Sequence, residues 1–331
     1  MREYALPLNY NLSTLGTDFD TIQDWNANRV EGVDLVGNMA GEVLYIPPGT
    51  YSDLTPVSLD PSNTPQTFND DYFPLIIGEP DNKPFLQFSG PTVEVGLAVS
   101  SEHGTRICDL GIDIETEVSL DMVTGIFYTV PSAPVYGCVV RNLIAPNISW
   151  IASGFASMTT ARWINCAIDA RGTVIAGGIN TVGFLALTEA HVNNLTLTHS
   201  DYTIGVMSFP GVTTYAKNCV IQNINYPTYG AVNQTTCAIN QGLLFDTDGY
   251  TLLTDDRGNG TDLSSDPTCP FSDDIFGSAR SPGQWERGAS IYSEVTHTAS
   301  RSYLGQPSKL VHPSLAQTVN VNMSNRIKRT R

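Results

Sequence analysis

Charged side chains at matched positions along the middle of the chain are the residues best suited to chemistry. Arg141 and Asp169 hold equivalent places in two successive copies of a repeated strand, and Arg171 follows two residues later. A carboxylate between two guanidinium groups has a lowered pKa, which suits a base or a nucleophile better than an acid. We therefore predict Asp169 as a catalytic carboxylate, with Arg141 and Arg171 binding an acidic sugar. The alternative is a structural ion pair between Arg141 and Asp169, which would contribute ~1 kcal/mol or less.

A second polar cluster follows in the next copy of the repeat, where Glu189, His191, His199 and Asp201 lie close together in sequence. Hydrolysis of a glycosidic bond needs two carboxylates ~5 to 9.5 Å apart. Glu189 is our prediction for the second carboxylate, and His191 and Tyr202 are predicted to bind substrate. A histidine in this position is more often a hydrogen-bonded residue at a turn than a catalyst.

Metal-ligand patterns are weak throughout the chain. The six cysteines form no C-x-x-C pair and no short cysteine-histidine spacing of the zinc type. Asp246, Asp248 and Gly249 match the core of a calcium loop, but Leu244 stands where a further carboxylate would be needed. We predict no cofactor, and calcium at this segment is left as an alternative to a solvated loop.

The charge balance excludes two classes of partner. Lysine and arginine total 17 against 33 aspartate and glutamate, so the net charge is -16 and the isoelectric point is near 4.5. Such a chain repels nucleic acid and anionic membrane surfaces. No stretch of eighteen apolar residues occurs, and residues 1–13 lack the pattern of a secretion signal. The expected location is extracellular or on a virion surface, and viral and cellular origins both stay open.

The elements that must position these residues repeat along the chain. Gly96, Gly125, Gly154 and Gly183 are each 29 residues apart, and Gly205 follows after 22. Each glycine opens a short apolar segment, and a second strand follows ten to fourteen residues later. Repeats of this length with short strands and no helical periodicity are typical of a β-solenoid. A β-sandwich is the structural alternative.

The second strand carries a cysteine in an alternating pattern in four of the copies, at Cys108, Cys138, Cys166 and Cys219, whereas the copy at 193–197 has asparagine in its place. Side chains alternate across a strand and coils stack ~4.8 Å apart, so these cysteines are predicted to form one buried, reduced interior file. The same alignment predicts two outward files, which are Gly111, Arg141, Asp169 and Asp113, Leu143, Arg171.

We predict an all-β chain in three parts. Residues 1–45 form an N-terminal arm with a capping helix from Asp20 to about Val36, in which Asp20 or Thr21 is the N-cap. Residues 46–245 form the coils. Residues 246–331 form an irregular acidic C-terminal extension, with an alternating terminal strand at 318–323 and a basic tail at 326–331.

The order Asp20-Thr21-Ile22-Gln23 followed by Val43-Leu44-Tyr45-Ile46-Pro47-Pro48-Gly49-Thr50-Tyr51 resembles the N-terminal signature of the pectate-lyase-like superfamily. That superfamily includes phage tailspike depolymerases, polygalacturonases and difructose-forming inulin fructotransferases. The resemblance implies a right-handed, single-stranded parallel β-helix that acts on glycans, often as a homotrimer. It identifies the scaffold and not the chemistry, because members include hydrolases, lyases and non-catalytic adhesins.

The motifs of the superfamily's enzymes are not reproduced. Arg326-Ile327-Lys328 resembles a polygalacturonase element, but it lies at the extreme C-terminus without the histidine-glycine coil that should precede it, and Asp255-Asp256 lies in a loop. Aromatic residues offer a way to bind sugar without cleaving it, because their rings can stack on sugar faces. The candidates at strand ends and turns are Tyr128, Trp150, Trp163, Tyr202, Tyr215, Tyr226 and Tyr229.

Three functions follow from these observations. The first is a tailspike-like protein that recognises, and in one version also cleaves, a polysaccharide as a hydrolase or lyase. The second is a non-catalytic structural spike or adhesin. The third is a difructose-forming transferase, which rests only on the shared opening motif.

A homotrimer is expected because the superfamily resemblance implies one and because four of the 17 basic residues fall within residues 326–331. That tail can dock on a neighbouring acidic subunit. Light scattering at micromolar concentration and low salt should give three times the monomer mass, and a monomer mass would contradict the prediction.

Overall fold

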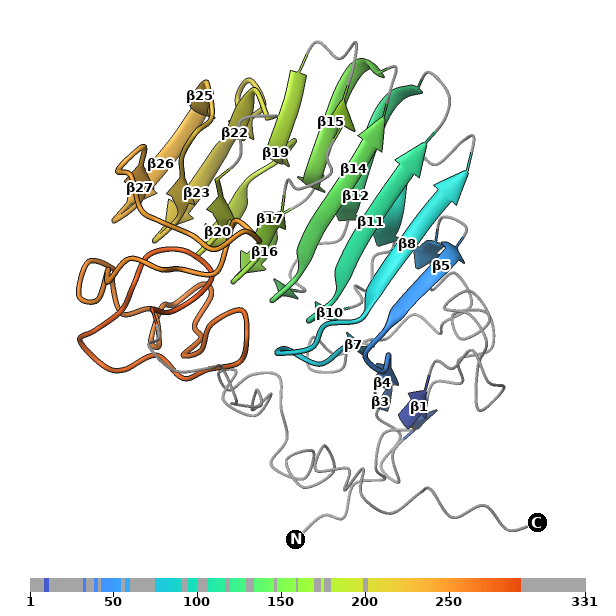
Figure 1. The fold of residues 1–331 in the computed structure, drawn as a ribbon, viewed down its shortest axis with the longest axis horizontal. Coiled ribbons are helices and arrows are strands. Elements are labelled where there is room, and N and C mark those ends of the chain that lie inside the picture. Colours follow the sequence, from blue (N-terminus) through green and yellow to red (C-terminus); the bar gives the residue numbers. More distant parts are fainter. Residues whose placement is uncertain are drawn as a thin grey trace, which may run out of the picture.

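A computed structural model describes residues 9–11, 32–33, 39–40, 43–54, 57–59, 75–90, 95–99, 106–116, 120–128, 134–145, 148–158, 160–169, 174–175, 180–198 and 202–292. These residues form β-strands and irregular segments, with no helix among them. All strand pairs in the three main sheets are parallel, and neighbours in each sheet lie one coil apart. The chain is therefore a parallel β-solenoid, as predicted (Figure 1).

Each complete coil contributes one strand to each of three sheets, and the coils at the two ends contribute fewer. Sheet 1 contains β1 (Asn9–Asn11), β4 (Val43–Tyr45), β7 (Leu75–Ile77), β10 (Arg106–Cys108), β13 (Pro134–Tyr136), β16 (Ala161–Ile164), β20 (Ala190–Asn193), β23 (Thr213–Lys217) and β26 (Ala231–Thr235). Sheet 2 contains β5 (Thr50–Leu54), β8 (Phe85–Gly90), β11 (Gly111–Thr116), β14 (Val139–Ala145), β17 (Ala167–Asp169), β21 (Thr196–Leu197), β24 (Val220–Ile221) and β27 (Ala238–Ile239), with β18 (Val174–Ile175) paired to β14. Sheet 3 contains β6 (Val57–Leu59), β9 (Val95–Val99), β12 (Leu120–Tyr128), β15 (Ile148–Ser157), β19 (Asn180–Ala186), β22 (Ile204–Ser208) and β25 (Tyr226–Tyr229).

The predicted N-terminal helix lies mostly outside the described residues. The two of its residues that are described, Gly32 and Val33, form β2 (Gly32–Val33), which pairs antiparallel with β3 (Met39–Ala40). The helix prediction is wrong for these two residues. The predicted terminal strand at 318–323 and the basic tail at 326–331 also lie outside the described residues.

Sheets 1 and 2 meet at a one-residue turn with a positive φ. In successive coils the residue at this turn is Asp109, Gly137, Asn165, Asn194, Asn218 or Thr236. The φ angles of these residues, and of Asn142 within β14, lie between 47° and 64°. Asparagine, aspartate and glycine adopt this left-handed conformation most readily. The turn thus explains why the repeat carries asparagine before the cysteine.

The residue after each turn points into the core, and this position defines the cysteine file. Cys138, Cys166 and Cys219 hold it, with Cys237 in the last coil. Cys108 does not, because it precedes its turn and pairs with Tyr136 in the next coil. Its place in the file is taken by Leu110, so the predicted file was misaligned by two residues at its first member. None of the six cysteines forms a disulfide, and all except Cys237 are buried.

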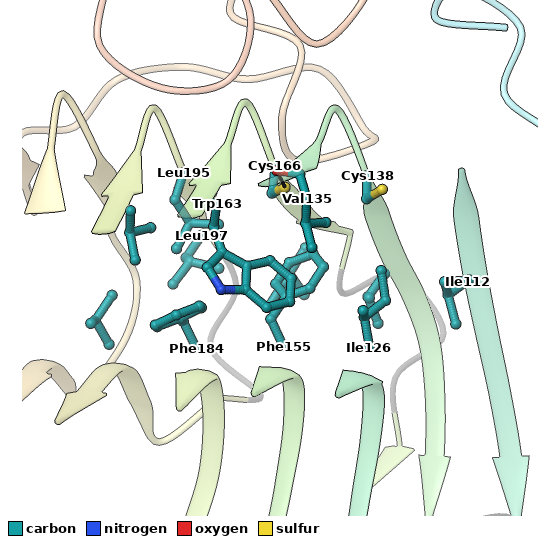
Figure 2. Close-up of a cluster of buried hydrophobic side chains, with 14 of the residues drawn as sticks. Ile112, Ile126, Val135, Cys138, Phe155, Trp163, Cys166, Phe184, Leu195 and Leu197 are labelled. Carbon is teal, nitrogen blue, oxygen red and sulfur yellow. Dashed lines mark hydrogen bonds between the residues drawn. The ribbon is translucent and has the colours of Figure 1, made fainter. Parts of the chain in front are cut away.

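Large rings fill the middle of the solenoid. The Trp163 ring lies between those of Phe155 and Phe184, at centroid distances of 5.2 and 5.5 Å (Figure 2). Burial raises the pKa of the Cys138 and Cys219 thiols well above the ordinary value, so both stay protonated beside these rings. The cysteines therefore act as small apolar side chains.

The predicted glycine repeat is confirmed as a file along sheet 3. Thr124 pairs with Ser153 and Ile126 with Phe155, which brings Gly125 level with Gly154 in the next coil. A Cβ atom on Gly125 would lie 2.6 Å from the carbonyl oxygen of Gly154, closer than side chains ever approach. The repeat needs glycine because the next coil occupies that space.

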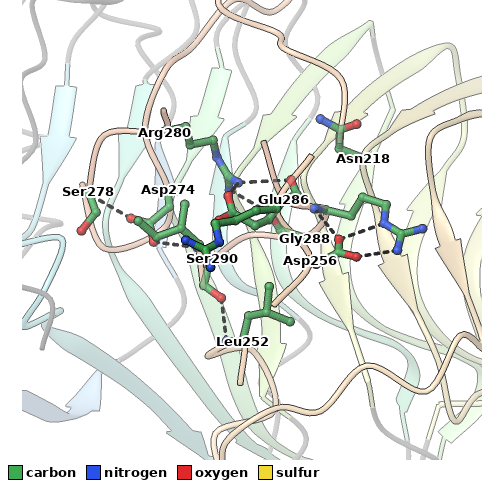
Figure 3. Close-up of polar contacts among 12 residues, drawn as sticks. Asn218, Leu252, Asp256, Asp274, Ser278, Arg280, Glu286, Gly288 and Ser290 are labelled. Atoms are coloured by element: carbon green, nitrogen blue, oxygen red, sulfur yellow. Dashed lines mark hydrogen bonds and ion pairs between the residues drawn. The ribbon is translucent and has the colours of Figure 1, made fainter. Parts of the chain in front are cut away.

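The C-terminal extension (residues 240–292) is irregular but densely bonded (Figure 3). The buried Asp274 carboxylate accepts hydrogen bonds from the backbone N–H groups of Phe276, Ser278 and Ile291. The buried Arg280 guanidinium donates to four backbone carbonyls, those of Asp273, Glu286, Gly288 and Ala289. Polar side chains thus supply the bonds that regular strands would otherwise make.

The C-terminal extension docks on the solenoid through the turn asparagines. Asn218 Nδ2 donates to the Thr261 carbonyl at 2.7 Å, and its Oδ1 accepts from the Thr261 N–H at 2.9 Å. Asn165 Nδ2 donates to the Asp273 carbonyl at 2.8 Å. Small outward residues of sheet 2 then make room for apolar side chains of the extension, including Val139 and Ala167 packed with Tyr250, Ile275 and Ala289.

The two turn asparagines Asn218 and Asn194 permit a matched test of this docking. Both have positive φ, so glycine keeps the backbone while removing the amide. Asn218→Gly loses three hydrogen bonds with the Thr261 backbone and the Thr236 hydroxyl, and should lower the free energy of unfolding by about 1–3 kcal/mol.

Asn194→Gly is the control, because both amide atoms of Asn194 are buried without a hydrogen-bond partner among the described residues. Its free energy of unfolding should stay unchanged or rise. Urea unfolding measures both variants, and equal losses would contradict the docking role of Asn218.

Candidate functional site

Arg141 and Asp169 are direct partners in the register between β14 and β17, on the outer face of sheet 2. The Arg141 guanidinium, however, bonds the Asp113 carboxylate of the preceding coil, at 2.7 and 3.1 Å. It also lies over the Phe85 ring, 3.2 Å from its centroid. Asp169 is only 2% exposed, so a ligand on this face would mainly meet the half-buried Arg141.

The predicted outward files were misaligned for the first coil. Asp113, and not Gly111, pairs with Arg141, whereas Gly111 pairs with Val139. The cause is the same two-residue offset that misplaced Cys108. The corrected file is Gln87, Asp113, Arg141 and Asp169.

Two members of the second predicted cluster, Glu189 and His191, lie on the outer face of sheet 1, and the other two, His199 and Asp201, lie outside the described residues. Glu189 is exposed just before β20, and its Oε1 atom lies 3.5 Å from Nε2 of His191. The His191 ring stacks on the Tyr215 ring of the next coil, with centroids 5.0 Å apart and an interplanar angle of 11°. Arg162 is the register partner of His191 on the preceding coil. Arg162, His191 and Tyr215 therefore form one outward file.

An apolar ridge borders this file at the turn from sheet 3 into sheet 1. Met158, Leu187 and Phe209 follow β15, β19 and β22 directly, one residue per coil. The Leu187 N–H donates to the Ser157 carbonyl, and the Phe209 N–H donates to the Ala186 carbonyl. These hydrogen bonds fix the register between successive coils. Met158 is 46% exposed and Phe209 39%. We call these three residues, together with Arg162, Glu189, His191 and Tyr215, the ridge surface.

Sequence reasoning missed the apolar ridge, although a signal for it exists. Met158, Leu187 and Phe209 each lie four residues after a repeat glycine, at Gly154, Gly183 and Gly205. The fixed spacing places them at the same point of successive coils. Exposed tyrosines that the sequence did suggest, Tyr226 and Tyr229, lie on the neighbouring β25.

The structure does not bring the two predicted catalytic carboxylates together. Asp169 lies on the outer face of sheet 2. Glu189 directly precedes β20 of sheet 1, so the whole of β20 and the turn at Asn194 separate it from sheet 2. Tyr202 is 2% exposed and belongs to the core, away from the outer surface. Arg171 lies outside the described residues.

Burial of the His191 ring lowers its pKa from the ordinary value of 6.5, and the Glu189 carboxylate opposes this effect. The imidazole is therefore neutral at pH 7, with one nitrogen that donates and one that accepts a hydrogen bond. Such a group, beside an exposed carboxylate and an arginine, suits ligands with many hydroxyl groups.

The described residues contain no group of three or more histidine, cysteine, aspartate or glutamate side chains placed to hold a metal ion. At the predicted calcium segment, Asp248 Oδ1 accepts hydrogen bonds from the N–H groups of Tyr250 and Thr251, at 2.9 and 2.8 Å. Asp248 thus caps a turn.

The described residues include no helix that is long and apolar enough to cross a membrane.

Comparisons of the chain with protein-family models, curated proteins and solved structures found no match. The function must therefore be argued from the site itself.

The His191 environment predicts a titration that NMR can follow. We expect a midpoint below 6.5 because burial disfavours the charged ring. Glu189→Gln should lower the midpoint further, because it removes the negative charge that favours the imidazolium. His191→Gln assigns the signal. A midpoint above 6.5, or a rise on Glu189→Gln, would contradict the geometry.

Proposed function

We propose that this protein recognises a polysaccharide along the ridge surface, as a right-handed β-helix of the pectate-lyase-like, tailspike kind. The observation that carries the proposal is the apolar ridge, with Met158 and Phe209 exposed and Leu187 half-buried, beside the stacked His191 and Tyr215 rings. Sugar rings present apolar C–H faces that pack on such side chains. One ridge residue per coil, at ~4.8 Å intervals, forms a linear array that suits an extended polymer.

Polar groups beside the apolar ridge supply orientation. Glu189 accepts hydrogen bonds from hydroxyl groups, Arg162 donates to ring and hydroxyl oxygens, and neutral His191 does both. A few polar groups next to an apolar surface are the usual composition of a ligand site. The net charge of -16 disfavours highly anionic polymers, so a neutral or weakly acidic polysaccharide fits best.

Recognition is better supported than cleavage. Hydrolysis requires a second carboxylate at a suitable distance from the first, and among the described residues the ridge surface offers Glu189 alone. The corresponding biological role is attachment to a glycan-coated surface, outside the cell or on a virion. A homotrimer would multiply the number of ridge surfaces and hence the avidity.

The ridge proposal is tested by alanine substitution of an exposed ring. Phe209→Ala should weaken binding to the preferred member of a panel of neutral and acidic polysaccharides by about tenfold, which corresponds to ~1.4 kcal/mol. Affinity electrophoresis measures the binding, and reducing ends together with unsaturated-uronate absorbance report any cleavage.

Leu253→Ala is the matched control, because Leu253 is a similarly exposed apolar residue of the C-terminal extension, and its neighbour Leu252 packs against Val220 and Ala238 of sheet 2. It should leave binding unchanged. Equal losses in the two variants, or no binding to any polysaccharide of the panel, would count against the proposal.

A further inference from the structure

The solenoid ends at an open coil. β25, β26 and β27 are the last strands of sheets 3, 1 and 2, so within the described residues each has a partner on one side only (Figure 1). The unpaired side carries backbone N–H and C=O groups that can bind another strand. Solenoid ends expose core surface in the same way and need a cover.

Core positions in this last coil are incompletely covered. Val232, Cys237 and Ile239 pack against the main core cluster on one side, yet all three are partly exposed. Residues at the same positions one coil earlier, Thr214, Cys219 and Ile221, are fully buried. Among the described residues, therefore, no further layer of chain covers β26 and β27.

The path of the chain indicates what supplies that layer. After β27 the chain forms the C-terminal extension and returns, because Tyr292 packs against the cluster that contains Val220 and Ala238 of the last two coils. The described residues end at Tyr292, beside the open coil, and 39 residues follow in the sequence. The last coils are short, with Thr213 paired to Ala231, so 39 residues are enough for one more coil.

Residues 318–323, Thr-Val-Asn-Val-Asn-Met, show the period-two alternation of a strand with one apolar face. We propose that this segment of the same chain pairs in parallel with β27 and places Val319 and Val321 over Cys237 and Ile239. The C-terminal residues thus act as the cap of the solenoid. This role is independent of the ridge surface and of glycan binding.

Cys237 makes the proposal measurable in the full chain. It is the one cysteine of the six that is not buried, so a thiol reagent such as DTNB under native conditions reports on it alone. Cys237→Ser should abolish the signal. If the cap is in place, the Cys237 thiol reacts slowly, at a rate that does not depend on protein concentration.

The decisive variant is Val319→Asp with Val321→Asp, which puts charges on the apolar face of the segment and should accelerate labelling at least tenfold. Asn320→Asp with Asn322→Asp is the matched control, because it adds the same charge to the opposite face and should leave the rate unchanged. Circular dichroism checks that the double variant folds. If it does not fold, the milder Val321→Thr replaces it, and we expect an intermediate acceleration of labelling.

Three outcomes would overturn the proposal. Rapid labelling of the unmodified chain would show that nothing covers Cys237. Protection that disappears on dilution would show that a second copy of the chain is the cover. Equal acceleration by the valine and asparagine variants would show that charge, and not the apolar face, controls access to the thiol.

Discussion

The one-residue turn between sheets 1 and 2 is the constraint on which the rest of the structure depends. It requires a left-handed backbone at the same point of six successive coils, which asparagine, aspartate and glycine supply at Asp109, Gly137, Asn165, Asn194 and Asn218 and threonine at Thr236. The turn fixes which residue next enters the core, and so produces the file of Cys138, Cys166 and Cys219. Because each coil pairs with the next in a fixed register, the position of the turn also determines which outward side chains contact each other.

The turn has a second role, since its side chains point toward the C-terminal extension. Asn165 and Asn218 use their amides to bind backbone groups of an otherwise irregular segment. Within that segment, Asp274 and Arg280 replace the missing ladder of strand hydrogen bonds. The acidic residues of this part of the chain therefore include structural groups that are buried and bonded, and not only solvated charges.

The sequence was sufficient to predict the solenoid, because periodicity is a property of residue spacing alone. The 29-residue spacing of Gly125 and Gly154 reflects a backbone contact that excludes any Cβ. The register of the first coil could not be predicted, because Cys108 and Leu110 both fit a buried position and only the φ of Asp109 decides between them. The same offset concealed the ion pair of Arg141 with Asp113. The burial of Tyr202 and the exposure of Phe209 depend on which side of a turn each residue lies, and strand alternation does not specify this.

The docked C-terminal extension changes how the protein is expected to unfold. A solenoid whose coils contact only their neighbours can fray from its ends in small steps. Here the extension contacts coils that are distant along the axis, through Lys83 at one end and Asn218 at the other. Opening any one coil between them therefore also breaks bonds to the C-terminal extension. Such long-range coupling converts a one-dimensional stack into a cooperative unit, which loses its structure in a single transition.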